Sequence, residues 1–187
     1  MARTAPSLEA LVRPLLRPGS RSAWGTLPDG RRWGTDYACL WGGRAELLNR
    51  VQARCLGVVG DGRWQFGTWQ AGEGEALDRF WDGLWPTTPV EDTGLCGKQE
   101  GLAPARVLWV PNCQQYVAIA ETYWQFLAGG ADLRLGRFGQ QGAIFGRPAW
   151  DPEGFVIVLP LRTSGAWRPQ WAAYLQPAGW LDEEAGR

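Results

Sequence analysis

The chain has 187 residues, 45% of them hydrophobic, which suffices for one domain with its own hydrophobic core. Its 19 basic residues balance its 19 acidic residues, and this zero net charge argues against a general nucleic-acid-binding surface. There is no histidine, so Ser-His and Cys-His nucleophile pairs are excluded, and a zinc site would need all four scattered cysteines, Cys39, Cys55, Cys96 and Cys113.

The first half of the chain predicts helices that alternate with hairpins. Ser7 precedes apolar residues at helical spacing and can cap a first helix. Residues 22–41 predict a hairpin that turns at a Pro-Asp-Gly sequence, and residues 44–55 predict a helix of about three turns. A second hairpin is expected to centre on Asp61-Gly62, and a short helix is expected at 73–85.

The second half begins with residues 86–104, whose turn composition predicts a long loop or insertion. A strand is expected at 105–110 and a helix at 112–128. Because apolar side chains surround most of this helix, it should be buried on most sides, which predicts an oligomer or a larger complex. Four strands are expected to follow, at residues 131–138, 141–150, 154–162 and 166–177.

The order of these elements repeats along the chain. When residues 39–69 are laid over residues 107–138, Leu40-Trp41 falls on Leu108-Trp109, and a helix, a turn and an alternating strand follow in both. The sequence therefore predicts an α+β fold in which duplicated β-α-β-β-β units form one domain over residues 1–187. The two helices should be related by a pseudo-twofold axis.

Pro160 lies inside the most strand-like run of the chain, residues 155–161. Because proline cannot donate a hydrogen bond to a neighbouring strand, this strand should run along the edge of a sheet or end at a groove. An apolar edge that ends in Pro160 and Arg162 can form the wall of a peptide-binding groove. The alternative is an ordinary edge strand that the proline protects from aggregation.

Residues 107–162 resemble the closing half of the last domain of the bacterial DNA polymerase sliding clamp, the β-clamp. Asn112 and Tyr116 match the start of the clamp helix, and residues 158–162, Val-Leu-Pro-Leu-Arg, match its last strand, of the type V-x-P-x-R. In that family this strand lines a pocket for short linear motifs of partner proteins. Residues 34–40 resemble the motif that forms the other wall, although they lack its Gly and Arg.

The resemblance implies an antiparallel, DNA-clamp-like fold and a non-enzymatic interaction module that binds partner proteins. The peptide-binding residues would be Val158, Leu159, Pro160, Leu161, Arg162, Thr35, Tyr37 and Leu40. It also implies contact with DNA by an oligomer, through Arg44, Arg50 and Arg54 on the helix at 44–55. Few arginines give weak, salt-sensitive binding, and the alternative is that these three form a solvated helix face.

Two other functions remain open on the sequence. The chain has 13 tryptophans, so an unrelated α/β binding or structural protein could stack them on a sugar or on single-stranded nucleic acid. An enzyme could use the carboxylates Asp78, Asp82, Glu91 and Asp92, but no phosphate loop or nucleophile elbow accompanies them. We expect no metal and no cofactor. Without an apolar run of about 18 residues, we also expect no membrane span and a cytoplasmic location with reduced thiols.

Overall fold

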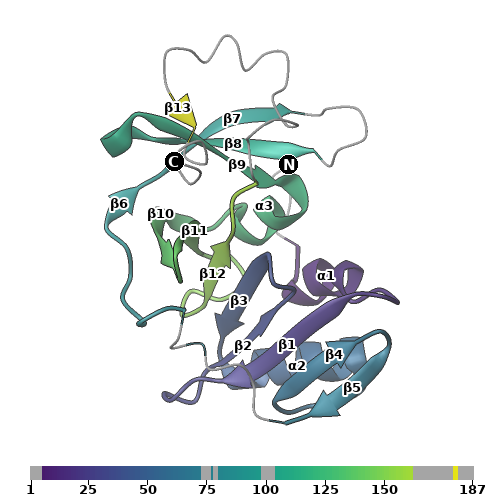
Figure 1. Ribbon diagram of the computed structural model, residues 1–187. Helices are drawn as coiled ribbons and strands as arrows, with labels where there is room; N and C mark the ends of the chain where they lie inside the picture. The colour runs from purple at the N-terminus through teal and green to yellow at the C-terminus, as the bar shows by residue number, and fades with distance from the viewer. Residues whose placement is uncertain (1–5, 73–76, 78–79, 98–103, 162–178, 181–187) are drawn as a thin grey trace.

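The computed structural model describes residues 6–72, 77, 80–97, 104–161 and 179–180. These residues form an α+β fold of two sheets and three α-helices, one of which lies between the sheets (Figure 1). We call the larger sheet, of nine strands within the described residues, sheet A, and the four-stranded sheet, sheet B.

The strands of sheet A, in chain order, are β1 (Arg21–Thr26), β2 (Arg32–Thr35), β3 (Cys39–Gly43), β4 (Gly62–Gln65), β5 (Thr68–Ala71), β6 (Thr88–Pro89), β10 (Ala131–Phe138), β11 (Gln141–Arg147) and β12 (Phe155–Val158). Across the sheet their order is β5-β4-β1-β2-β3-β12-β11-β10-β6. Sheet B contains β7 (Glu91–Gly97), β8 (Ala105–Val110), β9 (Gln115–Ala120) and β13 (Gly179–Trp180). All the strand pairs described are antiparallel except β13 with β9.

The helices are α1 (Leu8–Val12), α2 (Ala45–Leu56) and α3 (Glu121–Leu127), with one-turn 3-10 helices at Arg13–Leu15 and Pro111–Cys113. Ser7 caps α1 as its sequence predicts, since its hydroxyl accepts a hydrogen bond from the Ala10 N–H at 3.3 Å. α2 buries Leu48 and Val51 and ends at Gly57, which has the left-handed backbone that favours glycine there. The predicted helix after Ser7 and the predicted helix at 44–55 are therefore confirmed, the second shifted by one residue.

The main hydrophobic core lies between the inner face of sheet A, the three helices and the inner face of sheet B. Figure 1 shows α3 between the two sheets and α2 behind the strands β1 and β2. At the centre, Trp41 meets Trp24 edge-on at 5.8 Å between ring centroids and stacks on Phe126 at 5.4 Å. The core thus joins sheet A, through these tryptophans, to helix α3.

Glycines and aromatic residues alternate across the strands of sheet A. On the outer face one row crosses four neighbouring strands in the order Gly25, Trp33, Gly42, Phe155. On the inner face, Gly34 lies between Trp24 and Trp41 in the same way. A Cβ added at Gly25 would lie 2.7 Å from the Trp33 ring, and one added at Gly34 would lie 2.7 Å from Trp41 Nε1. Each glycine therefore leaves the space that a neighbouring ring fills.

A short segment, residues 80–86, covers part of the outer face of sheet A, and we call it the aromatic strap. Trp81 packs on Phe155 at 4.9 Å between ring centroids, and Trp85 meets Phe145 edge-on at 6.0 Å. The Trp85 Nε1–H donates to the Asp132 carboxylate at 2.6 Å, which ties the strap to β10. The strap and the outer face of sheet A together form a second core cluster.

The predicted helix at 112–128 is wrong in its first half. Residues 115–120 form β9, which pairs along its whole length with β8, and only residues 121–127 are helical. The last four residues of β9 are buried on both faces, so they give the continuous apolar pattern that a helix buried on every side would also give. Val117, Ile119, Trp124, Phe126 and Leu127 are covered within the chain itself, which removes the premise of the predicted oligomer.

Four further expectations need correction. The segment 86–104 contains β6 and β7 rather than a continuous loop. The second hairpin turns at Phe66-Gly67 rather than at Asp61-Gly62, because β4 begins at Gly62. The strand that precedes Pro160 is not at an edge, since β12 pairs with β3 on one side and with β11 on the other. The expected strand at 166–177 lies outside the described residues, as do residues 73–76 and 78–79 of the expected helix at 73–85. Residues 80–85 are described and are not helical, so the end of that predicted helix is wrong.

The duplication is not confirmed as two clamp-like units. The order strand, helix, hairpin does occur twice, as β3-α2-β4-β5 and as β9-α3-β10-β11. The pairing differs, because β4 returns to pair with β1, whereas β11 pairs with β12. The structure therefore supports the α+β class, while the pseudo-twofold relation stays a prediction.

Candidate functional site

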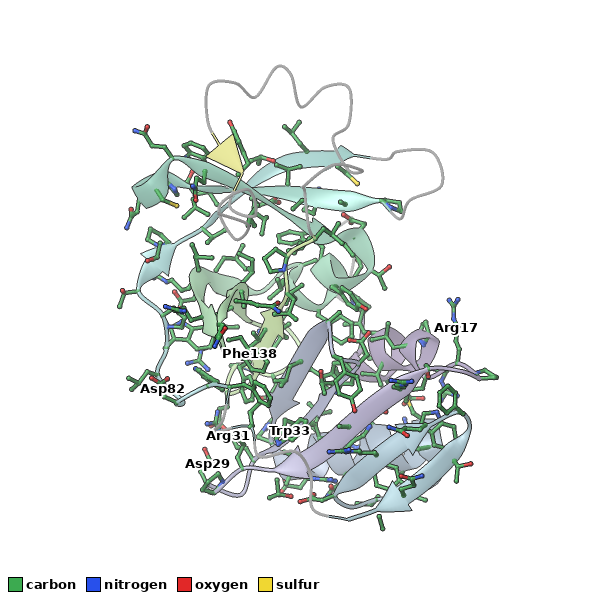
Figure 2. All side chains as sticks on the ribbon, in the orientation of Figure 1. Arg17, Asp29, Arg31, Trp33, Asp82 and Phe138 are labelled. Atoms are coloured by element: carbon green, nitrogen blue, oxygen red, sulfur yellow. The ribbon has the colours of Figure 1, made fainter. Side chains whose placement is uncertain are left out.

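An apolar cavity of about 480 Å³ opens on the outer face of sheet A, beside the aromatic strap. None of the described residues that line it carries a formal charge. They are Trp33, Thr35, Tyr37, Ala38, Cys39, Leu40, Leu77, Phe80, Phe138, Gly139, Gln140, Gln141, Ile157 and Leu159. Figure 2 labels Trp33 and Phe138, which belong to this lining, on the side of the sheet where the strap runs.

The floor of the cavity comes from three neighbouring strands. Thr35 of β2 lies directly opposite Leu40 of β3, and Leu40 lies directly opposite Ile157 of β12. Because directly opposed residues project from the same face of a sheet, the three side chains form one continuous row. All three are buried.

One wall comes from the tight turn between β10 and β11, which carries Gln140. Phe138, at the end of β10, stacks on Phe80 of the strap with 5.6 Å between ring centroids and 20° between the ring planes. The Gly139 N–H also donates to the Phe80 carbonyl at 2.7 Å. This wall is therefore held by a ring contact and a main-chain hydrogen bond.

The opposite rim is the turn at residues 36–38, between β2 and β3, which we call the rim turn. One Asp36 carboxylate oxygen accepts the N–H groups of Ala38, at 3.1 Å, and of Cys39, at 2.8 Å. The other oxygen accepts the Tyr123 hydroxyl of α3 at 2.7 Å. Burial, with the adjacent Asp36 charge, raises the pKa of Tyr123 above its ordinary value and so keeps this hydroxyl a donor.

Tyr37 occupies the middle of the rim turn in an uncommon backbone conformation. Its φ of 72° lies in the left-handed region, where residues other than glycine are strained. Its N–H donates to the Thr35 hydroxyl at 2.9 Å, and that hydroxyl donates to the Cys39 carbonyl, also at 2.9 Å. The conformation is therefore fixed from both sides, and Tyr37 remains 41% exposed at the cavity rim.

The structure brings together four of the eight residues that the sequence suggested for peptide binding. Thr35, Tyr37, Leu40 and Leu159 all line the cavity. Val158 does not, because it is fully buried in the main core on the inner face of sheet A.

Pro160 and Leu161 lead away from the cavity, toward sheet B. The Leu159 N–H donates to the Ala38 carbonyl at 2.9 Å, and the Leu161 N–H donates to the Ala118 carbonyl of β9 at 2.8 Å. Pro160, with no N–H, lies where the chain passes from one sheet to the other, and this explains the proline without an edge strand. Leu161 packs on a separate small cluster in sheet B. Arg162 lies outside the described residues.

The sequence did not identify the aromatic part of the lining. Trp33, Phe80 and Phe138 come from three separate segments, and no shared motif connects them. The one available signal was the predicted turn between the strands at 131–138 and 141–150. That turn does not indicate which segment packs against it.

Two of the three arginines proposed to contact DNA are bound to carboxylates. Arg44 Nε lies 3.2 Å from the buried Asp151, and Arg54 Nη1 lies 2.9 Å from Glu9. Arg50 is exposed on α2. A carboxylate beside each arginine offsets its positive charge, so these pairs lower the attraction of α2 for DNA phosphates.

Two of the carboxylates considered for an enzyme, Asp82 and Asp92, bind separate local partners. Asp92 forms a bidentate ion pair with Arg106, whose Nε lies 2.7 Å from Asp92 Oδ1. The Asp82 carboxylate accepts a hydrogen bond from the Leu84 N–H. Asp78 lies outside the described residues. Within the part of the chain that the structure describes, no group of three or more acidic, Cys or His side chains could hold a metal ion.

Comparisons of the chain with protein-family models, with curated proteins and with solved structures give no match. Among the described residues, no helix has the length and apolar character needed to cross a bilayer. The uncharged cavity is therefore the feature from which a function can be argued.

Proposed function

We propose that the protein is a non-enzymatic interaction module whose cavity on the outer face of sheet A binds apolar side chains of a partner peptide. One observation carries this proposal: about 480 Å³ of space is lined, among the described residues, without a single charged side chain. That volume lies within the range of small ligand sites, roughly 300–1,000 Å³. A charged occupant would lose its water without gaining a counter-ion, so an uncharged one is favoured.

Two features favour a peptide over a smaller ligand. Apolar surface continues past the mouth of the cavity, because Tyr37 is 41% exposed and Phe80 is 44% exposed at its rim. An occupant larger than the cavity can therefore gain contacts outside it. Gln140 and Gln141, both exposed at the β10–β11 turn, offer amide donors and acceptors that match the peptide group.

The resemblance to the sliding clamp agrees with a peptide site at this position. The cavity combines Leu159, from the strand that resembles the clamp's last strand, with Thr35, Tyr37 and Leu40, from the segment that resembles its second motif. A contact of this small area should bind with roughly micromolar affinity, about 8 kcal/mol. DNA contact has less support, since Arg44 and Arg54 are already paired with carboxylates.

Stacking of tryptophans on a ligand also has less support. Every tryptophan whose burial is described, from Trp24 to Trp150, is buried or half-buried. Trp24 and Trp41 are 0% exposed, and Trp33, which lines the cavity, is 2% exposed. Tryptophans covered in this way fill the core and offer little surface to a ligand.

The test uses a pair of matched leucines. Leu159 and Leu161 are both half-buried, and both donate main-chain hydrogen bonds, but only Leu159 lines the cavity. Capped peptides with two or three apolar anchors would be screened by fluorescence polarisation against the unmodified chain. Leu159→Ala should weaken the best peptide about fivefold or more, since it removes apolar contact area. Leu161→Ala should leave the affinity unchanged.

Stability serves as the control for this comparison. Each substitution removes a half-buried leucine, so each should lower the free energy of unfolding by about 1–2 kcal/mol. If the two variants lose affinity equally, the effect on binding comes from the fold and not from the cavity. If no neutral peptide saturates the unmodified chain, the proposed function is wrong.

A further inference from the structure

We infer that the anchor selected by the cavity is an uncharged aromatic side chain, and that Tyr37, held in a strained turn, is the residue that determines this specificity. The inference rests on the proposed function, because it describes what occupies the same cavity. It goes further in naming the chemical class of the anchor. It also names the side chain that distinguishes an aromatic anchor from an aliphatic one.

The lining itself favours an aromatic occupant. Besides the buried Trp33, three of the described lining residues carry rings: Tyr37, Phe80 and Phe138. Rings pack on rings in offset or edge-on geometry with a gain beyond the burial of apolar area. Phe80 and Phe138 already stack on each other, so their contact presents a ready-made aromatic wall. An aliphatic anchor would bury similar area without this additional gain.

The turn of the β2–β3 hairpin accounts for a positive φ at position 37 but does not require an aromatic side chain there. At φ 72° a glycine fits without strain, whereas a tyrosine carries a steric penalty. Tyr37 is also 41% exposed, so its ring contributes less to the core than a buried ring would. Asp36 and Thr35 hold the turn in this conformation through hydrogen bonds to the main chain. Strain that is fixed in this way at the rim of a cavity is typical of a binding residue.

Three other residues share the left-handed backbone with Tyr37, and each of the four lies at a turn or an irregularity; Tyr37 itself lies in the turn of the β2–β3 hairpin. Phe66 lies at the tip of the β4–β5 hairpin, where such turns require positive φ. Gln114 ends a 3-10 turn, and Asp132 lies at the irregularity in the pairing of β10 with β11. None of these three is among the described residues that line the cavity. Tyr37 alone of the four combines the strain with a place at its rim.

Phe66 provides a matched control for Tyr37. Both are exposed aromatic residues with positive φ, at 65% and 41% exposure, and only Tyr37 touches the cavity. Tyr37→Gly and Phe66→Gly should both still fold, because glycine relieves the strain at each position, which offsets the loss of ring contacts such as that of Phe66 with Arg21 at 5.3 Å. Tyr37→Asn serves as a second variant, since asparagine tolerates this backbone but has no ring.

The probes are two small amides and one acid, and their binding is measured by titration with saturation-transfer NMR. N-acetyl-tryptophanamide is a neutral aromatic, N-acetyl-leucinamide a neutral aliphatic, and N-acetyl-tryptophan an aromatic with a carboxylate. The unmodified chain should bind the tryptophan amide about five- to tenfold more tightly than the leucine amide or the acid. Tyr37→Gly and Tyr37→Asn should each remove most of the preference for the aromatic amide, and Phe66→Gly should keep it.

The outcomes separate this inference from the proposed function. If the two amides bind the unmodified chain equally, or if both Tyr37 variants keep the preference, the inference is overturned while the peptide site stands. Tighter binding of the carboxylate probe overturns the uncharged anchor. If none of the three probes binds and no capped peptide binds either, the proposed function and this inference both fail.

Discussion

Gly42→Ala should lower the free energy of unfolding by about 2–3 kcal/mol, although it adds only a methyl group. Gly42 lies in β3, directly opposite Phe155 of β12. A Cβ at this position would overlap the Phe155 ring. That ring is fully buried and already packs on Trp81 at 4.9 Å between centroids, so it has little room to move. The added methyl must therefore distort either the ring or the strand pairing.

Urea denaturation followed by circular dichroism would measure this loss, with Gly72→Ala as the control. No heavy atom lies within 4 Å of a Cβ added at Gly72, and its backbone is not left-handed. Gly72→Ala should therefore be neutral or stabilise the fold by up to about 1 kcal/mol. The comparison isolates the overlap with the ring, because both variants make the same chemical change.

A second substitution tests the cause directly. Phe155→Leu removes the ring that Gly42 accommodates, so the double variant should be more stable than the sum of the two single effects predicts, by about 1 kcal/mol or more. Strict additivity, or a Gly42→Ala variant as stable as Gly72→Ala, would refute the claim that glycines in sheet A make room for aromatic rings.

Two further predictions concern polar groups. Arg32 is buried and donates to the Gln52 side chain at 2.8 Å and to the Gly60 carbonyl at 2.6 Å, so Arg32→Met should destabilise the fold by about 2–4 kcal/mol in urea denaturation, whereas the exposed Arg50→Met should change it little. Burial raises the pKa of both Tyr123 and Cys39, so the folded chain holds these protons more tightly than the unfolded chain. This difference contributes its full share to the free energy of unfolding below the unfolded pKa values, about 9 for the thiol and 10 for the phenol. The contribution is lost as the pH rises beyond them. Urea midpoints between pH 7 and 11 should therefore fall above about pH 9, and Tyr123→Phe should reduce the slope.

Local patterns in the sequence predicted local structure well. Ser7 indicated the start of α1, and the apolar spacing in residues 44–55 indicated α2. The failure at residues 112–128 has a physical cause: β9 is covered by the main core on one face and by other side chains on the other. A strand buried on both faces loses the alternation that distinguishes a strand from a helix.

The sequence named only some of the residues that line the cavity, and the argument that led to them was only partly correct. Pro160 drew attention to the end of β12, where Leu159 does line the cavity, but the proline marks the passage between two sheets and not an edge. Phe80 and Phe138 could not be predicted, because their contact joins a strap and a hairpin 58 positions apart. Contacts of that kind depend on the pairing of strands distant in sequence, for which a single chain carries no periodic signal.

The position of the cavity and the high content of tryptophan and glycine are both related to how side chains align across the strands of sheet A. On the outer face, the row Gly25, Trp33, Gly42, Phe155 is filled, because each glycine lies beneath or beside a ring. The next row on the same face has medium-sized side chains and no glycine where it crosses β2, β3 and β12, at Thr35, Leu40 and Ile157. Its surface should therefore lie lower than the aromatic row beside it. The cavity lies over this lower row, with Trp33 of the filled row in its lining. Glycines thus lie opposite large rings on neighbouring strands of the sheet, and the cavity lies over the adjacent row, which has no such glycines.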